Sequence, residues 1–255
     1  MEELKVREWD NGWKNGYAVS GFDFSDDGVW VGFVVYNFSV GDTNIVIMFN
    51  YKEKNTSITR IYSKINQVVL TPSGYKFIIF SVPFEYYTTG DTTLKANVQL
   101  WDKKGNKFWT LRIPIEPGWY ATAFSYDEKK LVVGIGKSCY FLDILNGGIF
   151  WENKKVLDEC SGEATIKGID TSMNLDIICL WGSSYIGEIS FKKQGQDCIL
   201  ILNGDGKILK TVLVPFNYSG KGPFTAQIKR VIVSNDGKYF QILSNNSIKI
   251  FLVGG

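Results

Sequence analysis

The chain has 255 residues, of which 45% are hydrophobic, 15% aromatic and 21% charged, a composition typical of a globular protein rather than of a disordered, collagen-like or coiled-coil chain. Its formal net charge is +2 and its lysine pairs are scattered, so we expect no nucleic-acid partner. It contains no histidine, which excludes His-based catalytic triads, His metal ligands and an imidazole general base.

The first ten residues, MEELKVREWD, are charged and hold no apolar segment of the kind that a secretory signal needs. We therefore expect a cytoplasmic protein. The longest apolar runs, such as residues 29–35, have the length of a strand, far below the roughly 18 residues of a membrane-spanning helix, so no membrane association is expected. Residues 4–9 (LKVREW) have the pattern of one strand that stands before the first repeat.

Short segments rich in Val, Ile, Phe, Tyr and Trp alternate with Gly, Asn and Asp turns along the whole chain, and no convincing 3.6-residue pattern of helical length occurs. The chain is therefore predicted to be all-β. Five segments share one unit, in which an apolar strand ends in a turn led by Ser or Thr and a second apolar strand follows. These units occupy residues 21–35, 68–81, 122–136, 169–182 and 231–244.

Most repeats continue into a third and a fourth strand, and four antiparallel strands per repeat indicate a blade of a β-propeller. The last repeat lacks a fourth strand. We expect residues 4–9 to pair with residues 247–253 in this sheet, which would cover an open edge and close the ring. The interval from Gly237 through both chain ends to Gly28 is 46 residues, equal to the shortest interval between equivalent turns of neighbouring repeats, and this supports closure.

The predicted fold is a five-bladed β-propeller of four-stranded antiparallel blades, closed by the N-terminal strand, which completes the last blade. A stretched β-sandwich and a fragment of a larger propeller stay open as alternatives. The prediction is a single domain over residues 1–255, with approximate blade ranges of 17–63, 65–114, 119–157, 164–214, and 226–255 together with 3–10.

Two motifs give the repeats a resemblance to known propeller families. Residues Phe24–Gly28 and Val98–Asp102 resemble WD repeats, in which a strand ends in Phe-Ser-x-Asp-Gly and a later strand ends in Trp-Asp. Residues Asp102–Trp109 and Asp143–Trp151 are similar to quinoprotein-type (PQQ-like) repeats, in which a turn that begins with Asp and contains Gly precedes a strand bearing Trp. The resemblance covers nearly the whole chain and implies a β-propeller. Neither family's chemistry is implied, since the Gly-His pair of WD repeats is absent.

Two repeats are longer than the others, and the extra length falls at residues 83–94, 183–197 and 215–224. In a four-stranded antiparallel blade these connections emerge at one end, where loops commonly carry binding residues. We expect an aromatic binding face there, because Tyr and Trp offer large rigid contact areas; alternatively, several rings fold over the blades as additional core. The candidate binding residues are Trp13, Tyr17, Phe84, Tyr86, Tyr87, Trp119, Tyr120, Tyr185, Phe216, Tyr218 and Phe224.

The leading functional hypothesis is a non-enzymatic binding or scaffold propeller that takes a protein partner within a larger assembly. The alternative is a carbohydrate-active propeller that binds or hydrolyses glycans through the same face. Hydrolysis would need paired carboxylates, but Asp23 and Asp170 occupy equivalent repeat positions, which equally indicates a packing or hydrogen-bonding role. No P-loop, dinucleotide or metal-ligand motif occurs, so no cofactor and no metal site are expected. The carboxylate candidates are Asp23, Asp170, Glu116, Glu163 and Asp158.

The four cysteines show no CxxC spacing and are expected to be ordinary buried thiols. One disulfide, between Cys179 and Cys198, is considered as an alternative, because the two residues lie in strands that are predicted to be neighbours in one sheet. The remaining cysteines are Cys139 and Cys160.

Overall fold

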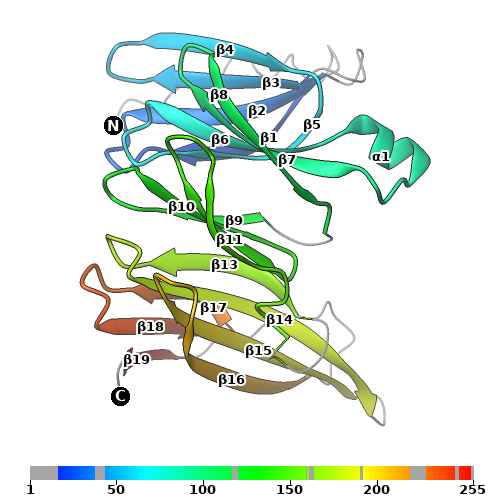
Figure 1. Ribbon diagram of the computed structural model, residues 1–255, viewed down its shortest axis with the longest axis vertical. Helices are drawn as coiled ribbons and strands as arrows, with labels where there is room; N and C mark the ends of the chain where they lie inside the picture. Colours follow the sequence, from blue (N-terminus) through cyan, green and yellow to red (C-terminus); the bar gives the residue numbers. More distant parts are fainter. Residues whose placement is uncertain are drawn as a thin grey trace. The chain divides into compact units, whose positions relative to one another are not determined.

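The computed structural model describes residues 17–37, 44–116, 120–158, 160, 164–189, 192–218, 228–244 and 247–253. These residues form antiparallel sheets and one short helix (Figure 1). They divide into two compact units, residues 1–115 and residues 116–255, each of which is described by itself.

The first unit contains two four-stranded sheets, and in each of them every strand pairs with the next one along the chain. The alternation of buried and half-buried residues in β3 shows why such a segment forms a strand: its apolar side chains point to one face of the sheet. The elements are β1 (Tyr17–Phe24), β2 (Trp30–Asn37), β3 (Asn44–Asn50), β4 (Asn55–Ile61), β5 (Lys64–Leu70), β6 (Lys76–Val82), α1 (Phe84–Thr89), β7 (Lys95–Asp102) and β8 (Lys107–Pro114).

The described part of the second unit contains two four-stranded sheets, β9–β12 and β13–β16, and the three-stranded sheet β17–β19. Neighbouring strands are again antiparallel and consecutive along the chain. The strands are β9 (Tyr120–Phe124), β10 (Lys130–Ile135), β11 (Ser138–Asp143), β12 (Ile149–Asn153), β13 (Thr165–Thr171), β14 (Ile177–Ile189), β15 (Lys192–Asn203), β16 (Ile208–Tyr218), β17 (Ile228–Val233), β18 (Tyr239–Ser244) and β19 (Ile248–Leu252).

The prediction of an all-β chain built from antiparallel, mostly four-stranded sheets is confirmed, and this architecture is consistent with a β-propeller. In their described residues, all three insertions differ from the expected loops, and residues 215–218 of the third continue β16. Residues 84–89 form helix α1. Residues 183–197 lengthen β14 and β15 into a long hairpin, because backbone pairing continues from Ser183 and Asp197 to Ile189 and Lys192.

The core of the first unit lies between its two sheets. Val34 and Met48 of the first sheet belong to one apolar cluster with Leu70 and Phe77 of the second, and each of these side chains is at most 4% exposed. Gly32 permits this approach, since a Cβ at that position would lie 2.5 Å from Cδ1 of Leu70. The two sheets therefore pack face to face.

In the second unit, the sheet β13–β16 is covered by apolar side chains on both faces. Leu180 and Leu200 belong to a buried cluster shared with the sheet β9–β12. Ile199 and Ile201, which point to the opposite face, belong to a cluster shared with Val231 of the three-stranded sheet. Alternate residues of one strand thus serve two different cores, which is why β15 is apolar almost without interruption from Cys198 to Leu202.

Three of the repeated turns share one arrangement of hydrogen bonds. The hydroxyl groups of Ser25, Ser125 and Ser234 each donate to the aspartate two residues later, at 2.6 to 2.7 Å. These bonds favour the charged carboxylate and so lower the pKa of Asp27, Asp127 and Asp236 below the ordinary value of 3.8. The sequence pattern Ser-x-Asp therefore stabilises the turn between the first and second strands of its sheet.

These turns lead to a prediction about acid stability. An aspartate whose pKa is lower in the folded than in the unfolded state stabilises the folded state at pH values above its ordinary pKa. This stabilisation is lost as the pH falls from the ordinary pKa through the lower pKa of the folded state. We expect the melting temperature of the wild type to fall between about pH 5 and about pH 2, and to fall less in the triple variant Asp27→Asn, Asp127→Asn, Asp236→Asn. Asp26→Asn, in the same first turn, is the control. Equal acid sensitivity of the wild type and the triple variant would contradict the prediction.

Candidate functional site

The antiparallel order of the strands places the connections of each sheet at two ends. The links from second to third strand, and from the fourth strand to the next sheet, emerge at one end, which we call the loop end. The links from first to second and from third to fourth strand emerge at the other end, which we call the turn end. Helix α1 connects β6 to β7, so it lies at the loop end of its sheet (Figure 1).

Helix α1 presents aromatic side chains to solvent. It begins after Pro83 and ends at Gly90, whose φ of 67° ends the helix in the left-handed conformation that glycine adopts without steric cost. None of its six residues is buried. Tyr86 and Tyr87 meet edge to face, with ring centroids 5.5 Å apart, and the Tyr87 side chain is 48% exposed. The insertion at residues 83–94 thus contains a short helix that carries a pair of packed tyrosines.

Tyr87 is held by two residues of the neighbouring strand β5. The ammonium group of Lys64 lies 4.0 Å from the centroid of the Tyr87 ring, a cation–π contact. The Tyr87 hydroxyl donates a 3.5 Å hydrogen bond to Oδ1 of Asn66. Partial burial raises the pKa of Tyr87, so its hydroxyl stays a neutral donor at physiological pH. We refer to Lys64, Phe84, Tyr86 and Tyr87 as the tyrosine patch.

The structure describes the side chains of four of the eleven predicted binding residues. Phe84, Tyr86 and Tyr87 come together in α1, and Tyr120 is half-buried at the start of β9. Across the long hairpin, Tyr185 of β14 pairs with Gly195, which in turn pairs with Phe216 of β16. The side chains of Tyr17, Tyr185, Phe216 and Tyr218, and all of Trp13, Trp119 and Phe224, lie outside the described residues.

The first-strand carboxylates have structural roles. In the first unit, Oδ2 of Asp23 accepts a 2.8 Å hydrogen bond from the amide of Leu70 in the next sheet. In the second unit, Oδ2 of Asp170 accepts a 2.7 Å bond from the amide of Val233 in the next sheet. Burial raises the pKa of both groups. The hydrogen-bonding role that their equivalent repeat positions indicated is confirmed.

The other carboxylate candidates are also engaged in local contacts. Glu116 accepts a 2.7 Å hydrogen bond from the amide of Lys137 and another bond from the hydroxyl of Ser138. Asp158 forms a surface ion pair with Lys155 at 3.8 Å. Glu163 lies outside the described residues. Asp23, Asp170 and Glu116 therefore link different parts of the chain by hydrogen bonds, whereas the contact of Asp158 is local.

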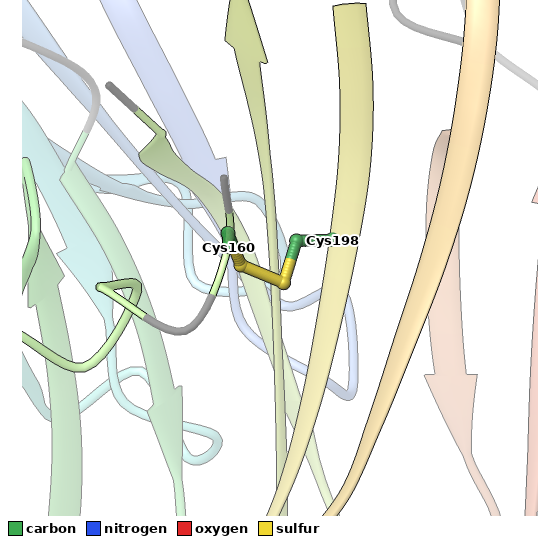
Figure 2. Close-up of a disulfide and its surroundings, with 2 residues drawn as sticks. All are labelled: Cys160 and Cys198. Carbon is green, nitrogen blue, oxygen red and sulfur yellow. A yellow bond between two sulfur atoms is a disulfide. The ribbon is translucent and has the colours of Figure 1, made fainter. Parts of the chain in front are cut away.

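The cysteine prediction is wrong in one respect. Cys160, in the connection between β12 and β13, forms a disulfide with Cys198 of β15, with Cα atoms 6.0 Å apart (Figure 2). The expected partner, Cys179, cannot bond to Cys198. Cys198 pairs with Gly182, which lies three residues after Cys179 in β14, so Cys179 points to the opposite face of the sheet. Cys139 and Cys179 are buried free thiols, and burial raises the pKa of both.

Within the described ranges, no group of three His, Cys, Asp or Glu side chains could hold a metal ion. No helix among these residues is long and apolar enough to cross a membrane.

The turn end of the second unit is hollowed between two sheets. A pocket of about 400 Å³ opens there, with Phe150, Trp151 and Asp205 in its lining. Phe150 and Trp151, which form one wall of the pocket, belong to the segment Asp143–Trp151 that is similar to a quinoprotein-type repeat. The opposite wall comes from a different sheet, so no local pattern could indicate the hollow itself.

No protein-family model and no curated protein matches the chain. Among solved structures, the chain is similar to hydrazine synthase from Kuenenia stuttgartiensis, with 12% identity and a TM-score of 0.53 over 87% of this chain and 54% of that one. This chain thus spans about half the length of that protein. The similarity concerns the fold alone.

Two further solved structures are similar at lower TM-scores. KlHsv2 with loop 6CD replaced by a Gly-Ser linker has 14% identity and a TM-score of 0.48, with 93% of this chain and 78% of that chain covered. A chain of the mitotic checkpoint complex has 11% identity and a TM-score of 0.45, with 92% and 77% covered.

Proposed function

We propose that the chain is a five-bladed β-propeller of one domain, closed by residues 4–9 on the edge of β19, and that it binds a protein partner through the loop end. The sheets serve as a rigid scaffold, and the aromatic residues of the loop end supply the contact surface. The tyrosine patch is the observation that carries the proposal.

The chemistry of the tyrosine patch favours protein recognition. Tyr86 and Tyr87 project from a helix with no buried residue, yet Tyr87 is fixed by Lys64 and Asn66. A ring already held in place loses little conformational freedom on binding, and tyrosine combines apolar area with a polar hydroxyl. Exposed aromatics of this kind are enriched among the residues that dominate binding energy at protein interfaces.

The binding proposal predicts which substitutions matter. With a partner recovered from native lysate, we expect Tyr87→Ala to weaken binding by roughly 2 kcal/mol, because a central interface aromatic commonly contributes that much. Trp119→Ala should have a similar effect, because residue 119 belongs to the connection between β8 and β9. Isothermal titration of the purified partner against each variant measures the difference.

Two turn-end variants serve as controls for this titration. Tyr75 is 56% exposed, close to the 48% of Tyr87, and lies in the turn between β5 and β6. We expect Tyr75→Ala and Lys104→Ala to leave the affinity within about 0.5 kcal/mol, as surface substitutions outside an interface do. A larger loss of affinity in the turn-end variants than in Tyr87→Ala would show that the partner binds at the turn end, and would contradict the proposal.

The cytoplasmic location expected from the sequence stays a prediction. The Cys160–Cys198 disulfide, in contrast, is typical of oxidising compartments. Fractionation of the native source, with alkylation of free thiols at lysis, measures location and disulfide content together.

A further inference from the structure

The pocket at the turn end of the second unit has the size of a small-molecule site. Its volume is about 400 Å³, within the roughly 300–1,000 Å³ that is typical of such sites. It is lined by residues of two neighbouring sheets, β9–β12 and β13–β16. It contains both exposed aromatic surface and charged groups.

The aromatic wall of the pocket is built and held before any ligand binds. Phe150 is 57% exposed, and its ring packs 5.3 Å from the buried ring of Phe141. Trp151 packs 5.6 Å from Phe141, and its Nε1 donates a 2.9 Å hydrogen bond to the carbonyl oxygen of Gly204 in the next sheet. Phe141, which also packs against Trp151, therefore supports Phe150, and Phe150 remains open to solvent.

Charged groups of both signs line the same pocket. They are the ammonium group of Lys130 and the carboxylates of Asp176 and Asp205. Lys130 lies over the Phe141 ring, with Nζ 5.8 Å from the centroid. Within the described part of the chain, the ion pairs found involve none of these three residues. Oδ2 of Asp205 accepts a 3.4 Å hydrogen bond from Nδ2 of Asn203, which leaves Oδ1 of Asp205 and the charged groups of Lys130 and Asp176 to face a ligand.

The combination of groups selects the class of ligand. An anionic ligand would meet two carboxylates, a cationic ligand would meet Lys130, and a purely apolar ligand would desolvate all three charges without compensation. A neutral saccharide avoids these costs. Its hydroxyl groups can donate to Asp176 and Asp205 and accept from Lys130, while the C–H face of a sugar ring packs on the electron-rich face of Phe150.

From this geometry we infer that the turn-end pocket binds one or two rings of a neutral saccharide. The inference is independent of the proposed protein-binding function, which concerns the opposite end of the sheets. The inference is of binding alone and includes no covalent step.

Four neutral trisaccharides are suitable probes: maltotriose, cellotriose, mannotriose and N-acetylated chitotriose. With the full chain, we expect saturation-transfer NMR signals from the ring protons of at least one probe, and titration should give its affinity. Phe150→Ala should weaken binding at least tenfold, about 1.4 kcal/mol, because it removes the stacking surface. Phe150 is largely exposed, so the variant is expected to fold, and its melting temperature checks this.

The chain supplies a matched control for the aromatic group. Phe108 is 53% exposed and occupies the equivalent place on β8, directly before a tryptophan. Phe108→Ala should leave the affinity unchanged. The polar groups are tested by the double variant Asp176→Asn, Asp205→Asn, which should also weaken binding, with Asp158→Asn as the control on an exposed aspartate.

Three results would overturn the inference. The first is the absence of binding by all four neutral probes. The second is an equal loss of affinity in Phe108→Ala and Phe150→Ala. The third is unchanged saccharide binding in both Phe150→Ala and the double aspartate variant, which would place the saccharide elsewhere on the chain.

Discussion

Loss of the Cys160–Cys198 disulfide should lower the free energy of unfolding by about 4 kcal/mol, because the bond closes a loop with a sequence separation of 38 residues and so restricts the unfolded chain. For a protein of this size, that corresponds to a fall in melting temperature of roughly 8 to 16 °C. The measurement is thermal unfolding of the wild type and of Cys160→Ala, Cys198→Ala, each with and without reductant.

The two remaining cysteines provide a matched control. Cys139 and Cys179 are buried free thiols, so Cys139→Ala, Cys179→Ala changes the core by a similar volume without removing a crosslink. This variant should keep the response to reductant, whereas the variant without Cys160 and Cys198 should lose it. Titration of the unreduced, denatured wild type should find two thiols, and finding four would show that the disulfide is absent.

Deletion of residues 1–10 should lower the melting temperature by several degrees. In the described residues, β19 is the last strand of a three-stranded sheet, and its side chains Ile248, Ile250 and Leu252 are 55–70% exposed. An unpaired edge bearing apolar side chains is commonly covered by another strand. Pairing with residues 4–9 would supply that strand, and losing its packing costs on the order of a few kcal/mol.

A proline comparison separates strand pairing from a simple change of length. Val6→Pro lies inside the proposed strand and should destabilise the protein, because proline cannot donate a hydrogen bond to a sheet. Glu2→Pro lies before the strand and should have little effect. Amide hydrogen exchange at residues 248–252 should accelerate in Val6→Pro. An unchanged melting temperature and unchanged exchange would rule out closure by this segment.

The strands and many turns followed from local sequence patterns. The Ser-x-Asp turns at Ser25, Ser125 and Ser234 form the same hydrogen bonds in three sheets, because both partners lie two residues apart in the chain. Apolar strands between these turns were equally visible, since side-chain alternation is a property of the strand itself. The helix at 84–89 was missed because six residues are too few to show a helical period.

The sequence by itself determined the all-β architecture, the repeat and the Ser-x-Asp turns, since each depends on residues close together in the chain. Tertiary structure decided the rest. Cys198 pairs with Cys160 and not with Cys179, because strand register places Cys179 on the other face of the sheet. The turn-end pocket likewise needs Phe150 from one sheet and Asp205 from the next. Both outcomes depend on which surfaces meet when sheets pack, and that contact is not encoded in any local pattern.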